Sequence, residues 1–118
     1  MKLFFEYPNC TTCKRAKKFL KENGIEFEEV SLKDKTPTKA QIKAVQGRMG
    51  LKRLFNTSGK TYRDLNLKEN FENLSADEAI KLLVKDGSLV KRPVLIDEEN
   101  KIFLIGFKEN DWNILLDK

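Results

Sequence analysis

The feature that most constrains this chain is a pair of cysteines, Cys10 and Cys13, placed where a short apolar run gives way to a helical pattern. Residues 3–5 predict a brief buried strand, and apolar residues then recur at helical spacing over residues 16–20. Cys10 is therefore expected in the turn from strand to helix, and Cys13 in the first helical turn. This spacing brings the two thiols within reach of a disulfide.

The setting of Cys10 favours a thiolate. The unpaired N–H groups at a helix start carry partial positive charge, and Lys14 and Arg15 add full charges nearby. A cysteine in such a place has its pKa lowered from about 8.5 into the range ~3.5–7.5. We therefore expect Cys10, nearer the exposed turn, to be the attacking thiolate and Cys13 to be the resolving thiol. The chain has no histidine that could act as a general base.

Three other interpretations of the cysteine pair remain open. A zinc site needs two more ligands, and the chain has two cysteines and no histidine. A structural disulfide across so short a loop would constrain the unfolded chain little. Two reduced cysteines could also simply be packed. A C-x-x-C pair beside a strand–helix pattern favours redox chemistry, so we expect no metal and no bound cofactor.

Length and composition predict one monomeric domain over residues 1–118. Charged residues make up 35% of the chain and hydrophobic residues 40%, as in ordinary globular proteins. The N-terminus lacks the residue succession of a signal peptide, and no apolar run approaches the ~18 residues of a membrane span. We therefore expect no membrane association, a cytoplasmic location and a transient disulfide.

Charge is unevenly distributed. The segment 33–63, here the basic segment, carries net +8, while the rest of the chain carries −3. It holds one acidic residue, Asp34, and nine basic residues: Lys33, Lys35, Lys39, Lys43, Arg48, Lys52, Arg53, Lys60 and Arg63. Such asymmetry marks either a surface for an acidic partner or the solvated face of lysine-rich helices. With few aromatic residues and no recognition helix, sequence-specific nucleic-acid binding is not expected.

The first half of the chain predicts a strand–helix–strand unit. The first helix should end at Asn23-Gly24, with Gly24 in the left-handed position. Residues 25–31 alternate as a second strand, and such a unit normally forms a parallel pair. Thr36-Pro37 then predicts another helix start, with Thr36 as its cap.

The second half predicts a helix, a hairpin and a closing helix. Ser75 and Glu78 form a capping box, and the helix that follows should end at Asp86-Gly87. The apolar runs 92–96 and 101–105 flank a turn and predict the hairpin. Residues 110–116 predict a short terminal helix.

This order, with a redox pair at the end of the first strand, resembles the thioredoxin fold and, more narrowly, the arsenate reductase-like ArsC family that includes Spx. The resemblance runs from Tyr7–Lys14 through the helical insert to Arg92-Pro93 and Gly106-Phe107. It implies an α/β fold, a mixed four-stranded sheet flanked by helices. A helical insertion over about 35–74 would separate the βαβ half from the ββα half.

The resemblance also implies a site around the cysteines. Pro93 should be a cis proline facing the cysteine loop, with Arg92 beside the thiolate to supply charge. Beside what the resemblance implies, Thr11 and Thr12 offer hydroxyls and amides to the Cys10 sulfur.

Three activities follow from the resemblance. The first is a thiol–disulfide oxidoreductase re-reduced by glutathione, a thioredoxin or a glutaredoxin. The second is a redox-switched, Spx-like regulator that binds RNA polymerase. The third is a glutaredoxin-dependent arsenate reductase. Arsenate reductases of the family hold the oxyanion with a cysteine and three arginines. Cys10 and Arg92 match, but the other two positions read Asn56 and Phe107-Lys108, and Cys13 agrees with the Spx branch.

The insert carries a candidate partner surface. Spx docks the C-terminal domain of the polymerase α-subunit through its insert, where a glycine matters, and Gly50 falls at or near that position. Lys52 and Arg53 follow it, where Spx is acidic. The alternative for Gly50 is a helix terminator.

Overall fold

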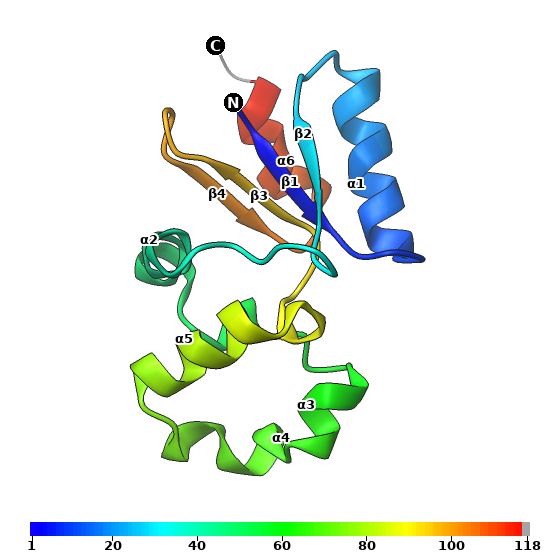
Figure 1. The fold of residues 1–118 in the computed structure, drawn as a ribbon. Coiled ribbons are helices and arrows are strands. Elements are labelled where there is room, and N and C mark those ends of the chain that lie inside the picture. The colour runs from blue at the N-terminus through cyan, green and yellow to red at the C-terminus, as the bar shows by residue number, and fades with distance from the viewer. Residues whose placement is uncertain (117–118) are drawn as a thin grey trace. The chain divides into compact units, whose positions relative to one another are not determined.

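The computed structural model describes residues 1–116, and the side chains of all of these except 47–49. The Arg48 side chain of the basic segment thus lies outside the described residues. The chain divides into two compact units, Met1–Ser31 with Arg92–Lys118, and Leu32–Lys91 (Figure 1). The single domain over 1–118 and an insert bounded at about 35–74 stay predictions. None of the described helices combines the length and apolar character needed to cross a membrane.

The first unit is built on a four-stranded sheet in the order β2-β1-β3-β4. Its strands are β1 (Leu3–Glu6), β2 (Glu28–Ser31), β3 (Val94–Asp97) and β4 (Ile102–Ile105). β1 and β2 run parallel, and the pairs β1–β3 and β3–β4 are antiparallel. The predicted fold class, a mixed four-stranded sheet flanked by helices, is confirmed, as are the parallel strand pair and the hairpin.

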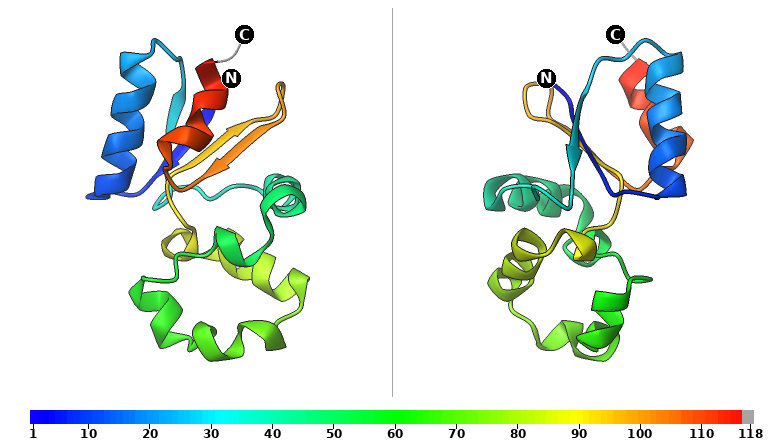
Figure 2. Two further views of the ribbon diagram at one scale, coloured as in Figure 1. Left: turned by 180° about the vertical axis from the view of Figure 1, so that it is seen from behind. Right: turned by 45° about the vertical axis from the view of Figure 1, so that its right-hand side comes forward.

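Two helical segments cover one face of this sheet, α1 (Thr11–Glu22) and α6 (Glu109–Trp112), the latter continued by the 3-10 turn η4 (Asn113–Leu116) (Figure 2). The sheet contributes Phe4, Leu95 and Leu104, which are paired across three strands and therefore point to the same side. The helices contribute Ala16, Phe19, Leu20 and Trp112 to the same cluster.

Local signals explain where these elements end. α1 stops at Asn23, and Gly24 follows with φ +65°, as predicted, because a left-handed residue suits glycine best. β2 is shorter than the predicted 25–31. Ile25 and Phe27 pack against the core from the preceding loop instead of extending the strand.

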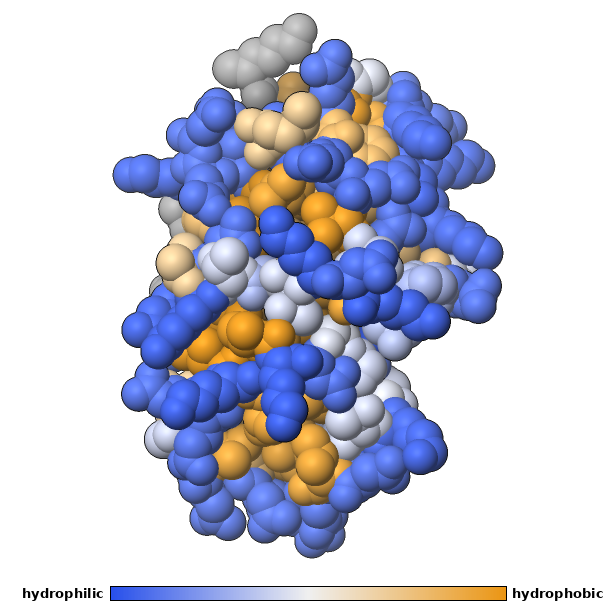
Figure 3. Space-filling model, in the orientation of Figure 1, coloured by the Kyte–Doolittle hydropathy of each residue, from blue (hydrophilic) through white to orange (hydrophobic). Residues whose placement is uncertain are grey.

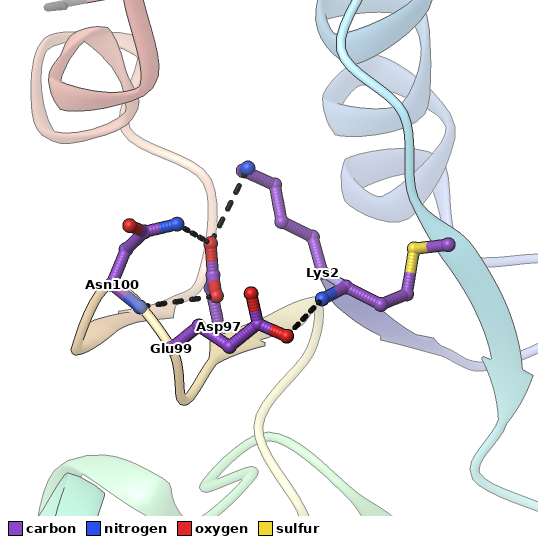
Figure 4. Close-up of polar contacts among 5 residues, drawn as sticks. Lys2, Asp97, Glu99 and Asn100 are labelled. Carbon is purple, nitrogen blue, oxygen red and sulfur yellow. Dashed lines mark hydrogen bonds and ion pairs between the residues drawn. The ribbon is translucent and has the colours of Figure 1, made fainter.

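The β3–β4 turn is held by a buried carboxylate (Figure 4). Asp97, which is 1% exposed, accepts hydrogen bonds from the Asn100 backbone N–H at 3.3 Å and the Asn100 side-chain amide at 2.8 Å. Lys2 Nζ lies 3.3 Å from Asp97 Oδ2. This pair ties the start of β1 to the end of β3, so the buried charge is both hydrogen-bonded and neutralised.

The second unit contains short helices and one isolated β-bridge. Its segments are α2 (Lys39–Met49), η1 (Lys52–Leu54), α3 (Lys60–Asp64), α4 (Leu67–Asn70), η2 (Phe71–Asn73), α5 (Ala76–Lys85) and η3 (Gly87–Leu89). Phe55 pairs with Val90 in the bridge, and its ring packs edge-on against Phe71, with centroids 5.3 Å apart.

One predicted helix start was wrong. The cap of α2 is Thr38, not Thr36. Thr38 Oγ1 accepts from the Gln41 backbone N–H at 3.1 Å, and the Gln41 side chain accepts from the Thr38 N–H at 2.9 Å. This reciprocal pair satisfies two orphan donors, which Thr36 could not do, and Thr36 instead donates to the Val84 carbonyl. The predicted capping box of Ser75 and Glu78 is confirmed at the start of α5.

Candidate functional site

Cys10 is the N-cap residue of α1, which places its sulfur at the start of the helix. Its backbone is extended, with φ −89° and ψ 110°, and its Sγ accepts a hydrogen bond from the Cys13 N–H at 3.2 Å. The Cys10 N–H donates to the Tyr7 carbonyl at 3.3 Å, which closes the turn out of β1. The sulfur therefore does what a Ser or Asp side chain does at other helix starts, and the predicted strand-to-helix placement is confirmed.

Cys13 lies on the buried face of α1. Its side chain is 1% exposed, whereas Cys10 is half-buried, and both are free thiols. Burial, and then a hydrogen bond to Cys10, raise the pKa of the Cys13 thiol to about 12. A hydrogen bond from the Tyr7 backbone opposes them, and the Glu6 carboxylate contributes a small further rise. Cys13 is thus a protonated thiol at neutral pH.

A charge cluster not anticipated from the sequence borders the cysteines. Lys17 Nζ lies 3.2 Å and 3.1 Å from the two carboxylate oxygens of Glu6, and 3.2 Å from Glu29 Oε1. Burial works against the charged lysine, but the two carboxylates outweigh it and raise the pKa of Lys17. Lys17 thereby links the end of β1 to β2. The sequence signal for this cluster was a lysine one turn after Cys13 together with a glutamate in each of the first two strands.

Arg92 and Pro93 directly precede β3. The Arg92–Pro93 peptide bond is cis, as the family resemblance implied. The Arg92 guanidinium carbon lies 4.4 Å from the centroid of the Tyr7 ring, a close cation–π contact. Tyr7 precedes the cysteine turn, so Arg92 is held against the residue from which that turn begins. Its predicted place beside the Cys10 sulfur stays a prediction.

The remaining predicted residues of the cysteine loop lie on the first turn of α1. Thr11 and Lys14 are exposed, and Thr12 is half-buried. α1 has no acidic residue in its first turn, so nothing there offsets the positive end of the helix. Among the described residues, no group of three or more His, Cys, Asp or Glu side chains is arranged to hold a metal ion.

The positions that arsenate reductases fill with arginine have other tasks here. The Asn56 N–H donates to the Leu89 carbonyl at 2.8 Å, and its side-chain amide reaches the Ser88 carbonyl at 3.4 Å, so Asn56 fastens its own unit. Phe107 packs between rings, with its centroid 5.3 Å from that of Trp112. Lys108 is exposed and caps α6.

The predicted partner residues lie in the second unit. Gly50 ends α2 with φ +84°, which by itself favours glycine, so the helix-terminator interpretation has a direct structural basis. Lys52 and Arg53 are exposed in η1. Lys52 Nζ lies 5.9 Å from the centroid of the Phe71 ring.

Curated relatives match nearly the full chain. YusI of Bacillus subtilis is 45% identical over 111 residues, covering 92% of each chain. The regulatory protein MgsR of the same organism is 34% identical, covering 92% of this chain and 84% of MgsR. The global transcriptional regulator Spx 2 of Bacillus anthracis is 30% identical, covering 94% and 83%.

Solved structures agree with the fold. An ArsC family related protein from Bacteroides fragilis superposes with a TM-score of 0.88 at 40% identity, covering 97% of this chain and 96% of that one. A possible arsenate reductase from Streptococcus mutans gives 0.85 at 39% identity, covering 96% and 98%. The ArsC family sequence model matches residues 5–115. With the cysteine turn, the cis Arg-Pro step and the sheet all in place, this chain belongs to the ArsC family.

Proposed function

We propose that this protein is a thiol–disulfide oxidoreductase of the cytoplasm that cycles between the Cys10/Cys13 dithiol and its disulfide. The observation that carries the proposal is the asymmetry of the pair. The Cys10 sulfur is half-buried at the positive start of α1, and Cys13 is a buried thiol whose N–H contacts that sulfur at 3.2 Å. An accessible nucleophile with a shielded partner is what a two-step exchange requires.

In the first step the Cys10 thiolate attacks a substrate disulfide. A bond forms between Cys10 Sγ and one substrate sulfur, and the other substrate sulfur leaves as a thiolate. In the second step Cys13 loses its proton and attacks Cys10 Sγ. The intramolecular disulfide forms, and the second substrate thiolate leaves. Two electrons have passed to the substrate, and a thiol reductant such as glutathione, a thioredoxin or a glutaredoxin restores the dithiol.

Trapping of the intermediate tests this proposal. A Cys13→Ser variant stops after the first step, so a small disulfide such as bis(2-hydroxyethyl) disulfide should leave one adduct on Cys10, visible by mass spectrometry. A Cys10→Ser variant is the matched control and should acquire none under the same conditions. Equal labelling of the two variants, or no adduct on either, would sink the proposal.

A second candidate function is a redox-switched transcriptional regulator. It is favoured by the similarity to MgsR and Spx 2. Lys52 and Arg53 are exposed where Spx is acidic, so the docking face of this chain would be basic and would fit an acidic partner surface. In this function the cysteine pair would control binding of RNA polymerase by the insert. Figure 3 shows one face of the molecule, which is largely hydrophilic with hydrophobic areas between.

Binding to purified RNA polymerase tests the second candidate. Lys52→Glu with Arg53→Glu should abolish binding and leave the Cys10–Cys13 reduction potential unchanged. Lys68→Glu with Lys81→Glu, a charge-matched pair of exposed residues outside the basic segment, should bind like the parent protein. Absence of binding by the parent in both redox states would remove the regulator and leave the oxidoreductase.

A further inference from the structure

A hollow of about 350 Å³ lies beside the redox helix, entirely within the first unit. Four of its lining residues belong to α1 and two belong to the segment around the start of α6: Arg15, Lys18, Phe19, Glu22, Phe107 and Glu109. None of these residues takes part in the exchange steps. The hollow is therefore a feature of the surface that the redox function leaves unexplained.

The helical spacing connects this hollow to Cys10. Residues 11, 15, 18 and 22 follow one another at intervals of four, three and four, so they share one stripe of α1. Thr11, the first residue of that stripe, adjoins Cys10 in sequence. The hollow consequently lies on the stripe of α1 that starts beside Cys10, and its first lining residue, Arg15, comes one turn after Thr11.

The charges along the hollow are ordered. The Arg15 guanidinium is laid over the Phe107 ring, 5.6 Å from its centroid, and Phe107 in turn packs on Phe19 with centroids 5.8 Å apart. This cation–π contact holds the guanidinium over the ring and does not use its N–H donors, which can still bind a ligand. Among the residues that the structure describes, neither Arg15 nor Lys18 makes an ion pair. Along α1 the two cations thus lie nearer Cys10 and Glu22 lies toward the far end, while Glu109 lines the hollow from α6.

We propose that this hollow is a substrate subsite that selects disulfide-bearing peptide segments with an acidic residue close to the reacting cysteine, held by Arg15 and Lys18. The proposal rests on the redox function proposed above and adds a substrate class to it. Arg15 comes five residues after Cys10, ~7.5 Å along the helix axis. An extended peptide covers that distance in about two residues. The preferred acid therefore stands two positions from the substrate cysteine.

Matched peptides test the subsite without an identified reductant. The probes are three peptide disulfides that differ only two positions from the cysteine, where they carry Glu, Gln or Lys. The measurement is the second-order rate constant for oxidation of the fully reduced protein in a single turnover. At low salt the Glu peptide should react about fivefold faster than the Gln peptide, with the Lys peptide slowest, and ~1 M salt should erase most of the difference.

Two double variants complete the experiment. Arg15→Gln with Lys18→Gln should bring the Glu-to-Gln rate ratio close to one. Lys21→Gln with Lys91→Gln removes the same charge from exposed positions outside the hollow and should keep the parent ratio. If Arg15 and Lys18 act only by favouring the Cys10 thiolate, their double variant reacts more slowly with both peptides and keeps the Glu-to-Gln rate ratio. That result overturns the subsite. If neither the peptides nor bis(2-hydroxyethyl) disulfide oxidise the parent protein, the redox function itself has failed.

Discussion

The backbone N–H of Cys13 donates to the sulfur of Cys10 over 3.2 Å, so one contact both caps α1 and binds the reactive atom. The helix start and the nucleophile are for this reason a single structural element. A negative sulfur accepts such a hydrogen bond more strongly than a neutral one. Burial of Cys13 acts on the other sulfur in the opposite sense.

This difference predicts that alkylation distinguishes the two cysteines. In the folded protein at pH 7, iodoacetamide should modify Cys10 and leave Cys13 unmodified, because Cys13 is buried and its pKa is raised to about 12. Mass spectrometry of digests over a pH series checks the order. The urea-unfolded protein is the control and should react at both sites. Equal rates at the two sites in the folded protein would exclude the proposed roles.

The Glu6–Lys17 pair should tune the resolving thiol. Glu6→Gln removes a negative charge that raises the Cys13 pKa, so the pKa should fall, whereas Lys17→Gln leaves Glu6 unscreened and should raise it. The ultraviolet absorbance of the Cys13 thiolate against pH, in a Cys10→Ser background, measures both directions without a reagent that must reach the buried sulfur. Glu29→Gln is the control, because it removes a carboxylate of the same cluster from β2 and leaves in place Glu6, whose charge raises the Cys13 pKa. Identical pH profiles for all three would remove the electrostatic link.

The sequence predicts those parts of the site whose conformation depends on neighbouring residues in the chain. The C-x-x-C spacing, the strand before it and Gly24 after the helix suffice to place both cysteines, because strand ends, caps and left-handed residues are local signals. The cis Arg92–Pro93 bond came only from family resemblance. Thr36-Pro37 predicts a helix start because proline suits the first helical position, yet the reciprocal Thr38–Gln41 hydrogen bonds place the cap at Thr38.

Contacts between distant segments could not be predicted. Lys17 reaches Glu29 on β2, and Arg15 lies over Phe107, 92 positions further on. The periodicity of the sequence does not show which charged side chains form contacts, because those contacts depend on how the strands pair and where a helix crosses them. The hollow beside α1 follows from such meetings, and so only the folded chain shows it.

Arsenate reduction should be weak or absent. Asn56 and Phe107-Lys108 stand where the resemblance puts two of three oxyanion-binding arginines, and both have structural tasks here. Losing two bidentate guanidinium contacts removes most of the binding for a tetrahedral oxyanion. An assay with arsenate, glutathione and glutaredoxin checks this, with a known arsenate reductase as positive control. Turnover near that of the control would contradict it. Asn56→Arg alone should not create full activity.

The last prediction concerns acid stability and the buried carboxylate of the hairpin. Burial would raise the pKa of Asp97, but hydrogen bonds from Asn100 and the charge of Lys2 outweigh it and hold the pKa below its ordinary value. A group whose pKa is lowered by folding stabilises the fold above its unfolded pKa of about 3.9. That contribution is lost as the pH falls through the lower, folded value.

Asp97→Ala should therefore lower the free energy of unfolding by ~1–3 kcal/mol at pH 7, since it leaves Lys2 and the Asn100 amides without their acceptor. The loss should shrink as the pH falls below about 4, the unfolded pKa of the carboxyl group, because the parent protein gives up the same contribution there. Urea unfolding at several pH values measures it. Glu99→Ala, which removes an exposed carboxylate from the same turn, serves as the control and should change stability little. A pH-independent loss for Asp97→Ala would mean that packing, not the charged form of Asp97, supports the turn.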